Sequence, residues 1–209
     1  MRSADDNADD YIHENPNLAQ DYIYPAVVQE LERNTSIRTI FEIGVGTGDV
    51  LQRLSDSGFK VFGIDPSING ISQARAKYPM LPVENASAYD RLADKYGTWD
   101  AVLSLEVIEH LYRPHTFART AFDLLRPGGL FALSTPFHGY WKNLALAATG
   151  MMDQHFMALR EHGHIKFWSA KTINELLADT GFKQIKIVRT GRVPAFAKSM
   201  VVFATKPDE

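Results

Sequence analysis

Residues 41–50 read FEIGVGTGDV and place three glycines, Gly44, Gly46 and Gly48, at alternate positions directly behind an apolar run. The apolar run predicts a strand, and the residues from Asp49 onward predict a helix. Glycine at a strand-to-helix turn permits positive φ and lets backbone amides approach a ligand closely. The stretch therefore predicts a ligand site at the end of a strand.

Strand-like and helix-like segments alternate outward from this turn. The runs that predict strands are residues 37–43, 59–64, 80–83, 99–105, 129–134, 185–188 and 200–204. The segments that predict helices are residues 22–31, 49–57, 67–77, 88–95, 115–125 and 170–180. Such alternation predicts an α/β fold with a mainly parallel sheet covered on both faces. The loop at residues 189–199 predicts that the chain then turns back antiparallel.

The size of the chain predicts one domain. A chain of 209 residues with 45% hydrophobic content can bury one substantial core and is short for two. We expect a single domain over residues 1–209, with an N-terminal helical cap at residues 1–35. Residues 136–168 form an insertion where a simple crossover would suffice, and an insertion at a strand's carboxyl end is typical of a lid.

Composition excludes several classes of function. A net charge of -3 without a Lys/Arg block makes a nucleic-acid partner unexpected. Cysteine is absent, so any metal must be held by oxygen and imidazole. The polar, acidic residues 1–22 predict no export signal, and the apolar residues 144–152 are too short to cross a bilayer. These features predict a cytoplasmic protein.

The glycine spacing differs from that of dinucleotide-binding turns. Those turns use the first, third and sixth positions and hold a pyrophosphate at the helix N-terminus. Here the glycines take the first, third and fifth positions, and Asp49 adds a negative charge where a pyrophosphate needs donors. Asp65, which ends the second strand, can accept bonds from ribose hydroxyls. Asn85 and Ser87 are candidates for an adenine edge, and Ala86 can pack near the ring, so the pattern favours a nucleoside without a pyrophosphate.

Several segments together resemble the class I S-adenosylmethionine-dependent methyltransferases, over roughly residues 36–206. They are residues 42–48, Asp65, Asn85-Ala86, WDAVLSLEVIEHL at 99–111 and LLRPGGLFALSTP at 124–136. The resemblance implies a Rossmann-like three-layer sandwich, with a seven-stranded, mostly parallel sheet and an antiparallel last strand. It also implies that S-adenosylmethionine is the cofactor and lies across the glycine turn.

The same resemblance assigns the cofactor contacts. They are Glu42, Gly44, Gly46, Gly48, Asp65, Pro66, Asn85, Ala86 and Leu105. It implies that Glu42 lies near the amino acid part of the cofactor, Asp65 near the ribose and the end of the third strand near the adenine. Asn85 departs from the family pattern, in which Asp is more usual at this position.

A Glu-x-x-Glu-His pattern follows the fourth predicted strand. If the chain is helical there, Glu106, Glu109 and His110 lie on one helical face. Two carboxylates so close repel each other unless a cation lies between them, and oxygen and imidazole ligands suit Mg²⁺, Mn²⁺ or Zn²⁺. Without a metal, Glu106 would contact the substrate, Glu109 would be solvated, and His110 would act as a base or bond a backbone carbonyl.

This pattern, with the later segment REHGHIKFWSAKTI at residues 160–173, resembles the ubiquinone-biosynthesis O-methyltransferases. A similar metal-site pattern occurs in small-RNA 2′-O-methyltransferases. The resemblance implies that Glu106, Glu109, His110 and a later histidine hold a divalent cation that binds the acceptor oxygen. The two families favour different histidines, so His164 and its alternative His162 both remain. We predict His110, Glu106 and His164 as catalytic residues, because an acceptor hydroxyl must lose its proton.

The predicted function is methyl transfer from S-adenosylmethionine to a small-molecule acceptor. Oxygen is favoured over nitrogen, because no Asn/Asp-Pro-Pro-Tyr/Phe motif follows the fourth strand. The insertion, which is rich in aromatic residues, methionine and histidine, has three interpretations: a pocket wall, a peripheral membrane contact, or a helix packed on the sheet edge. An NAD-dependent oxidoreductase and a non-catalytic S-adenosylmethionine-binding regulatory domain are the alternative functions.

Overall fold

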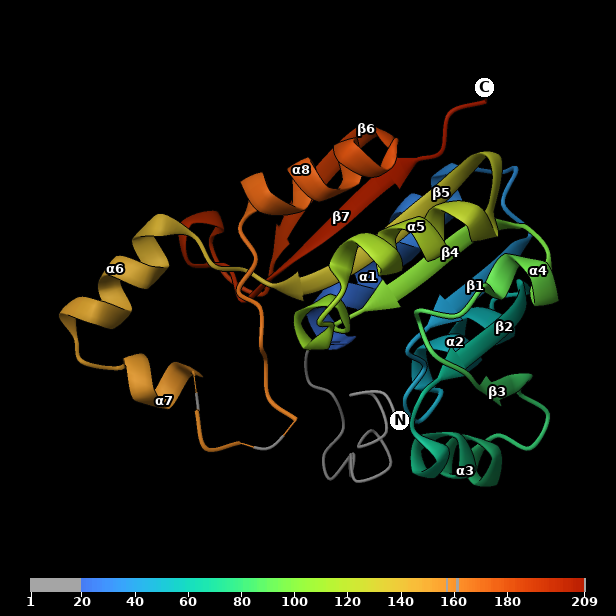
Figure 1. Cartoon of the computed structure of the whole chain (residues 1–209), viewed down its shortest axis with the longest axis horizontal. Helices are drawn as coiled ribbons and strands as arrows, with labels where there is room; N and C mark the ends of the chain where they lie inside the picture. Colours follow the sequence, from blue (N-terminus) through green and yellow to red (C-terminus); the bar gives the residue numbers. More distant parts are fainter. Residues whose placement is uncertain (1–19, 157, 161, 209) are drawn as a thin grey trace.

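One sheet of seven strands organises the computed structural model, which describes residues 20–156, 158–160 and 162–208 (Figure 1). The strand order is β3-β2-β1-β4-β5-β7-β6. The strands are β1 (Thr39–Ile43), β2 (Lys60–Asp65), β3 (Val83–Asn85), β4 (Trp99–Leu105), β5 (Leu125–Pro136), β6 (Lys183–Thr190) and β7 (Ser199–Thr205). The pairs from β3 to β5 are parallel, and β7 is antiparallel to β5 and to β6. The predicted seven-stranded Rossmann-like fold with an antiparallel last strand is confirmed.

Helices cover both faces of this sheet. They are α1 (Gln20–Arg33), α2 (Asp49–Asp56), α3 (Ile68–Lys77), α4 (Leu92–Tyr96), α5 (Pro114–Leu124), α6 (Tyr140–Ala148), α7 (Met152–Phe156) and α8 (Ala170–Thr180), with the short 3-10 helices η2 (Ile108–His110) and η3 (Pro194–Phe196). Phe41 and Val102 belong to one buried cluster, while their neighbours Ile40 and Ala101 belong to the other. This division follows from the alternation of side chains along a strand.

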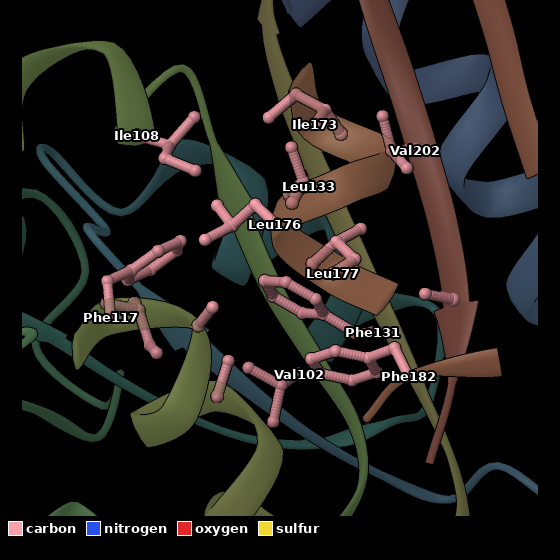
Figure 2. Packing of buried hydrophobic residues seen from close by; sticks show 14 of the residues in the cluster. Val102, Ile108, Phe117, Phe131, Leu133, Ile173, Leu176, Leu177, Phe182 and Val202 are labelled. Atoms are coloured by element: carbon pink, nitrogen blue, oxygen red, sulfur yellow. The ribbon is translucent and has the colours of Figure 1, made fainter. Parts of the chain in front are cut away.

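The larger cluster packs α4, α5 and α8 onto one face of the sheet. Figure 2 shows Phe117 of α5 and Leu176 and Leu177 of α8 converging on Phe131 of β5. The opposite face is covered by α1, α2 and α3 through residues such as Val27, which is fully buried. With both faces buried, the sheet is a rigid base for the loops that follow its strands.

The carboxyl ends of the parallel strands bring the predicted site residues to one edge. β1 ends at Ile43 directly before the glycine turn, β2 ends at Asp65, and β3 ends at Asn85. β4 ends at Leu105, one residue before Glu106. In open α/β sheets, ligands bind at this edge, next to the point where the strand order reverses.

The insertion (residues 136–168) leaves the sheet after β5 and returns close to where it left. Ile165 N and Lys166 N donate to the backbone oxygen of Glu109 over 2.9 and 3.0 Å, and His138 N donates to Trp168 O over 3.1 Å. Between these anchors, α6 and α7 stand off from the sheet in Figure 1. Neither helix contributes a fully buried residue, although both are described along their whole length.

Three local expectations differ from the structure. The third strand is Val83–Asn85 rather than residues 80–83, and Met80 is 94% exposed in the preceding turn. The fifth strand begins at Leu125 rather than at residue 129, and it contains the glycine pair at residues 128–129, where the register with β4 shifts. The chain after β4 forms η2 rather than an α-helix, because Glu106 has a positive φ of 56°.

Two other expectations concern membranes and the N-terminus. Among the described helices, none has both the length and the apolar content that a bilayer crossing requires. Of the predicted helical cap at residues 1–35, the structure describes the part from Gln20 onward, which forms α1. The prediction about an export signal concerns residues 1–22, most of which lie outside the described part of the chain.

Candidate functional site

The glycine turn has the backbone geometry that its residue types predict. Gly44, Gly46 and Gly48 have φ values of 87°, 52° and 81°, a region that L side chains rarely adopt. A Cβ atom at Gly44 would clash with Cγ2 of Val107. Glycine is therefore needed at this position for its conformation and for the space that Val107 occupies.

Asp65 joins the glycine turn to the loop after β2. Its Oδ2 accepts from Gly46 N over 2.8 Å, and its Oδ1 accepts from Ser67 N over 2.9 Å. The side chain is buried, with 8% exposed. Asp65 therefore fixes the glycine turn against the loop after β2.

Asp49 gives the first turn of α2 a fixed negative charge. Its Oδ1 accepts from Lys77 Nζ over 2.5 Å and from Tyr78 Oη over 2.7 Å, and Thr47 Oγ1 donates to its Oδ2 over 2.7 Å. Although partial burial raises the pKa of Asp49, these hydrogen bonds hold it below its ordinary value. An ionised carboxylate at this helix end repels a phosphate, which agrees with a nucleoside that lacks a pyrophosphate.

Glu42 is a buried carboxylate with an unsatisfied oxygen at the same edge. The residue is 2% exposed, and its Oε2 has no hydrogen-bond partner among the described residues. Burial raises the pKa of Glu42 to about 8, and the charge of Asp65 adds to this effect. A buried acceptor without a partner costs free energy unless a ligand satisfies it, so Glu42 fits a cationic or donor group of a cofactor.

Glu42 makes the stability of the ligand-free protein depend on pH. Its pKa in the folded state lies above that of an unfolded glutamate, so the folded state binds the proton more tightly. The free energy of unfolding should therefore fall as the pH rises from about 4.5 to about 8, by up to about 1.4 kcal/mol per pH unit from this group. Urea denaturation at several pH values should show that Glu42→Gln removes this part of the slope.

A matched control separates this effect from the general titration of the chain. Glu175 lies on α8 with 56% of its side chain exposed, so Glu175→Gln should keep the wild-type slope. An identical slope for wild type and Glu42→Gln would show that Glu42 is not protonated in the folded state near neutral pH.

The ends of β2 and β3 are tied together by Asn85. Its Nδ2 donates to the backbone oxygens of Asp65 and Pro66 over 3.0 and 2.8 Å, and Ala86 N donates to Asp65 O over 3.2 Å. Because both donors of Asn85 are used, it can offer a ligand only its acceptor Oδ1. Pro66 is exposed beside this edge, and Leu105 is partly buried against the core.

Glu106 is not part of the compact donor group that Glu109 and His110 form with His164. Its Oε1 accepts from Ser134 Oγ over 2.9 Å, and its Oε2 accepts from Ser199 Oγ over 3.4 Å. Glu106 N in turn donates to Ser134 Oγ over 3.0 Å. Burial raises the pKa of Glu106 to about 7, against the effect of the two serines. The expectation that Glu106 shares a helical face with Glu109 and His110 is wrong, because its positive φ turns the chain before η2 begins.

Glu109, His110 and His164 form a compact donor group. One ligand atom from each residue lies within 4.8 Å of the others, and His164 Nε2 is 4.0 Å from Glu109 Oε1. Glu109 is 1% exposed, and neither carboxylate oxygen has a hydrogen bond of ordinary geometry among the described residues. Burial raises the pKa of Glu109, and the charge of Glu106 raises it further.

Both imidazoles of this group favour the neutral form. Burial lowers the pKa of His164 to about 4, and the neighbouring His110 lowers it further. Burial also lowers the pKa of His110, although hydrogen bonds with the backbone of Gly163 and His162 oppose the shift. Neutral imidazoles and a carboxylate without partners are a donor set that fits a divalent cation. Of the two alternative histidines, the structure brings His164 to this group and leaves His162 outside it.

A cavity of about 770 Å³ lies beside this group. Glu106, His110 and His164 line it together with residues of the insertion. Four cationic side chains also line it: Lys142, Arg160, Arg192 and Lys198. These four cations and the two serines that bind Glu106 are scattered along the sequence and form no motif. The sequence pattern therefore did not indicate them as site residues.

Comparison with known proteins shows the family of the chain. A family model described as a methyltransferase domain matches residues 11–187. A ubiquinone biosynthesis O-methyltransferase of Caulobacter sp. is 34% identical over 62% of this chain and 55% of its own length. Another protein of that name, from Bradyrhizobium diazoefficiens, is 31% identical over 62% of this chain and 54% of its own. The chain thus spans about half the length of the curated relatives it matches.

Solved structures agree on the fold. The magnesium protoporphyrin IX methyltransferase of Synechocystis, with bound SAH, has a TM-score of 0.69 over 94% of this chain and 90% of that chain. The two sequences are 18% identical, so this likeness concerns the fold alone.

Proposed function

The chain belongs to the S-adenosylmethionine-dependent methyltransferases, and from this premise we propose that it methylates a hydroxyl oxygen of a small molecule with the help of a divalent cation. One observation carries the proposal: the buried carboxylate of Glu109, which has no hydrogen bond of ordinary geometry among the described residues, lies with His110 and His164 beside a cavity of about 770 Å³. The names of the ubiquinone biosynthesis relatives support oxygen as the acceptor atom.

The glycine turn and the strand ends would hold the cofactor. When bound, S-adenosylmethionine supplies a methyl group on a positively charged sulfur. Glu42 offers its Oε2, which is unsatisfied among the described residues, to a donor group, and Asp65 holds the turn beside the expected ribose through Gly46 N. The positive φ of Gly44 shapes the turn on which the cofactor lies. These residues fix the position and orientation of the methyl group, and alignment accounts for much of the acceleration in such a displacement.

Glu109, His110 and His164 would hold the divalent cation. When bound, the cation makes an acceptor hydroxyl more acidic. The three residues supply one carboxylate and two neutral imidazoles, which suit Mn²⁺ or Zn²⁺ better than Mg²⁺. His110 and His164 line the cavity, so the group lies beside the space in which an acceptor would bind.

Glu106 is placed to take the acceptor proton. It lines the cavity, and Ser134 and Ser199 fix its carboxylate. A pKa of about 7 is close to the value that suits a general base near neutral pH. The sequence predicted both Glu106 and His110 as catalytic residues and as metal ligands. We assign them different roles: Glu106 serves as the base, and His110 holds the cation.

The insertion would act as the lid of this cavity. Lys142 and Leu146 of α6 and Phe156 of α7 line it, which supports the pocket-wall interpretation. Tyr140 and Trp141 of α6 are 73% and 61% exposed, and aromatic side chains favour membrane interfaces, so peripheral membrane contact through the lid stays a prediction. A cytoplasmic location and the absence of a nucleic-acid partner also stay predictions.

A turnover screen tests the proposed reaction. The purified chain should transfer a labelled methyl group from S-adenosylmethionine to catechols or other hydroxyl compounds, and not to matched amines. EDTA should lower the rate at least about 10-fold, and Mn²⁺ or Zn²⁺ should restore it. Transfer to amines alone, or full activity after dialysis against a chelator, would contradict the proposal.

A further inference from the structure

The cavity beside Glu106 is strongly cationic, although the chain as a whole has a net charge of -3. Its cations come from separate segments: Lys142 from α6, Arg160 from the loop after α7, and Arg192 and Lys198 from the loop between β6 and β7. Glu106 is the single carboxylate among the described lining residues. The excess of positive charge is therefore local to the place where an acceptor would bind.

These cations lack carboxylate partners within the described part of the chain. Lysines elsewhere, such as Lys77 and Lys95, make ion pairs with Asp49 and Glu84 at 2.5 and 2.6 Å. No comparable pair forms at Lys142, whose Nζ donates instead to the backbone oxygen of Phe137 over 2.9 Å. Burial lowers the pKa of Lys142, and the positive charge of Arg192 lowers it further. The nearby charge of Glu106 opposes this shift. Four cations against one carboxylate among the described lining residues still leave an excess of positive charge, which suits an anionic ligand.

An apolar wall faces the same space. Phe156 and Phe167 line the cavity with ring centroids 4.7 Å apart, and His138 stacks on Phe156 at 5.9 Å. Met151 and Leu146 extend this wall. A volume of about 770 Å³ lies within the range of pockets for small organic ligands.

We propose that the methyl acceptor is an aromatic hydroxy acid, whose carboxylate binds to Arg192 and Lys142 while its ring lies against Phe156 and Phe167. This inference rests on the proposed function, because it names the substrate class of the same site. Arginine suits this task, since its planar fork can bind a carboxylate through two parallel hydrogen bonds.

Matched acceptors that differ only in charge test the inference. The probes are 3,4-dihydroxybenzoate, 3,4-dihydroxycinnamate and the methyl ester of each. We expect kcat/KM to be at least about 10-fold higher for each acid than for its ester, as a hydrogen-bonded charge pair would give. Arg192→Gln should raise KM for the acids about 10-fold with little change in kcat, and should leave KM for the esters unchanged.

The choice of variants keeps the charge effect separate from catalysis. Lys142 lowers the pKa of Glu106, so Lys142→Met should change kcat as well as KM, and Arg192→Gln is the cleaner probe. Lys171 lies on α8 outside the cavity, and Lys171→Met should match wild type with every probe. Equal kcat/KM for acids and esters, or transfer to an RNA 3′ end and to no acid, would overturn the inference.

Calorimetry separates failure of this inference from failure of the proposed function. Binding of the acids but not the esters, with no methyl transfer to any probe, would support the anionic site and contradict the proposed reaction. Methyl transfer to the esters as efficient as to the acids would support the reaction and contradict the anionic site. Binding of neither acids nor esters would overturn the inference.

Discussion

Glu109→Gln is expected to abolish binding of a divalent cation and to lower the rate of methyl transfer by about 100-fold or more, without lowering the stability of the metal-free protein. Loss of a cation that stabilises developing charge raises the activation free energy by several kcal/mol. A rise of about 2.7 kcal/mol corresponds to a 100-fold lower rate. The measurements are metal content after dialysis, methyl transfer with added Mn²⁺ or Zn²⁺, and urea denaturation in EDTA.

The unusual part of this prediction concerns stability. Glu109 is 1% exposed, and both of its oxygens lack ordinary hydrogen bonds among the described residues. A buried charge without a partner destabilises the fold, so a neutral amide of the same shape should leave the free energy of unfolding unchanged or raise it. With metal present, wild type should be more stable than Glu109→Gln, because only wild type gains binding free energy from the cation.

Histidine variants provide the controls for this experiment. His164→Ala should lose the metal as Glu109→Gln does, because both residues belong to the same donor group. His115 is exposed at the start of α5, so His115→Ala should retain wild-type metal content and activity. If Glu109→Gln retained both metal and activity, this group would not be the cation site.

Gly44→Ala is expected to lower the free energy of unfolding by about 2–4 kcal/mol and to weaken S-adenosylhomocysteine binding by about 100-fold or more. A positive φ costs an L residue about 1–2 kcal/mol, and the new Cβ would also clash with Cγ2 of Val107. The turn must shift to relieve this contact, which would displace Gly46 and the carboxylate of Asp65 that binds it. Urea denaturation and calorimetry measure the two losses.

Two further variants divide the expected loss into its parts. Gly58 has a φ of 90°, and no atom lies within 4 Å of the place that a Cβ would take there, so Gly58→Ala should cost only the conformational part and leave cofactor binding intact. Val107→Ala removes the atom that Gly44→Ala would meet, so the double variant should recover part of the lost stability. Equal losses for Gly44→Ala and Gly58→Ala would show that contact with Val107 is unimportant.

Local sequence patterns predicted most of the fold. The alternation of apolar runs and amphipathic helices predicted all seven strands, because a strand that packs in a sheet leaves a short apolar run in the local sequence. The turn at Gly44 to Gly48 was also predictable, since positive φ leaves a direct signal in residue type. The third strand was placed too early, because Met80, which begins the apolar run, lies in a turn and is exposed.

The sequence predicted the geometry of the site less well than the fold, because this geometry depends on hydrogen bonds between residues that are distant in the sequence. Ser134 and Ser199 hold Glu106 from 28 and 93 residues away, and no local pattern indicates such partners. The positive φ of Glu106 also defeats prediction, because glutamate ordinarily favours helical geometry there. A strained backbone conformation of this kind persists only where tertiary contacts enforce it, and such conformations cluster at functional sites.

The exposed packing of α6 and α7 has a consequence for how acceptor specificity can change during evolution. Both helices are described in full and contain no buried residue, yet they supply part of the wall of the cavity that we propose as the acceptor site. Mutations there should cost the folding of the sheet little, since they remove no core packing. Ancestral chains could therefore have exchanged one acceptor for another through drift in these two helices, while the apparatus that presents the methyl group was inherited intact.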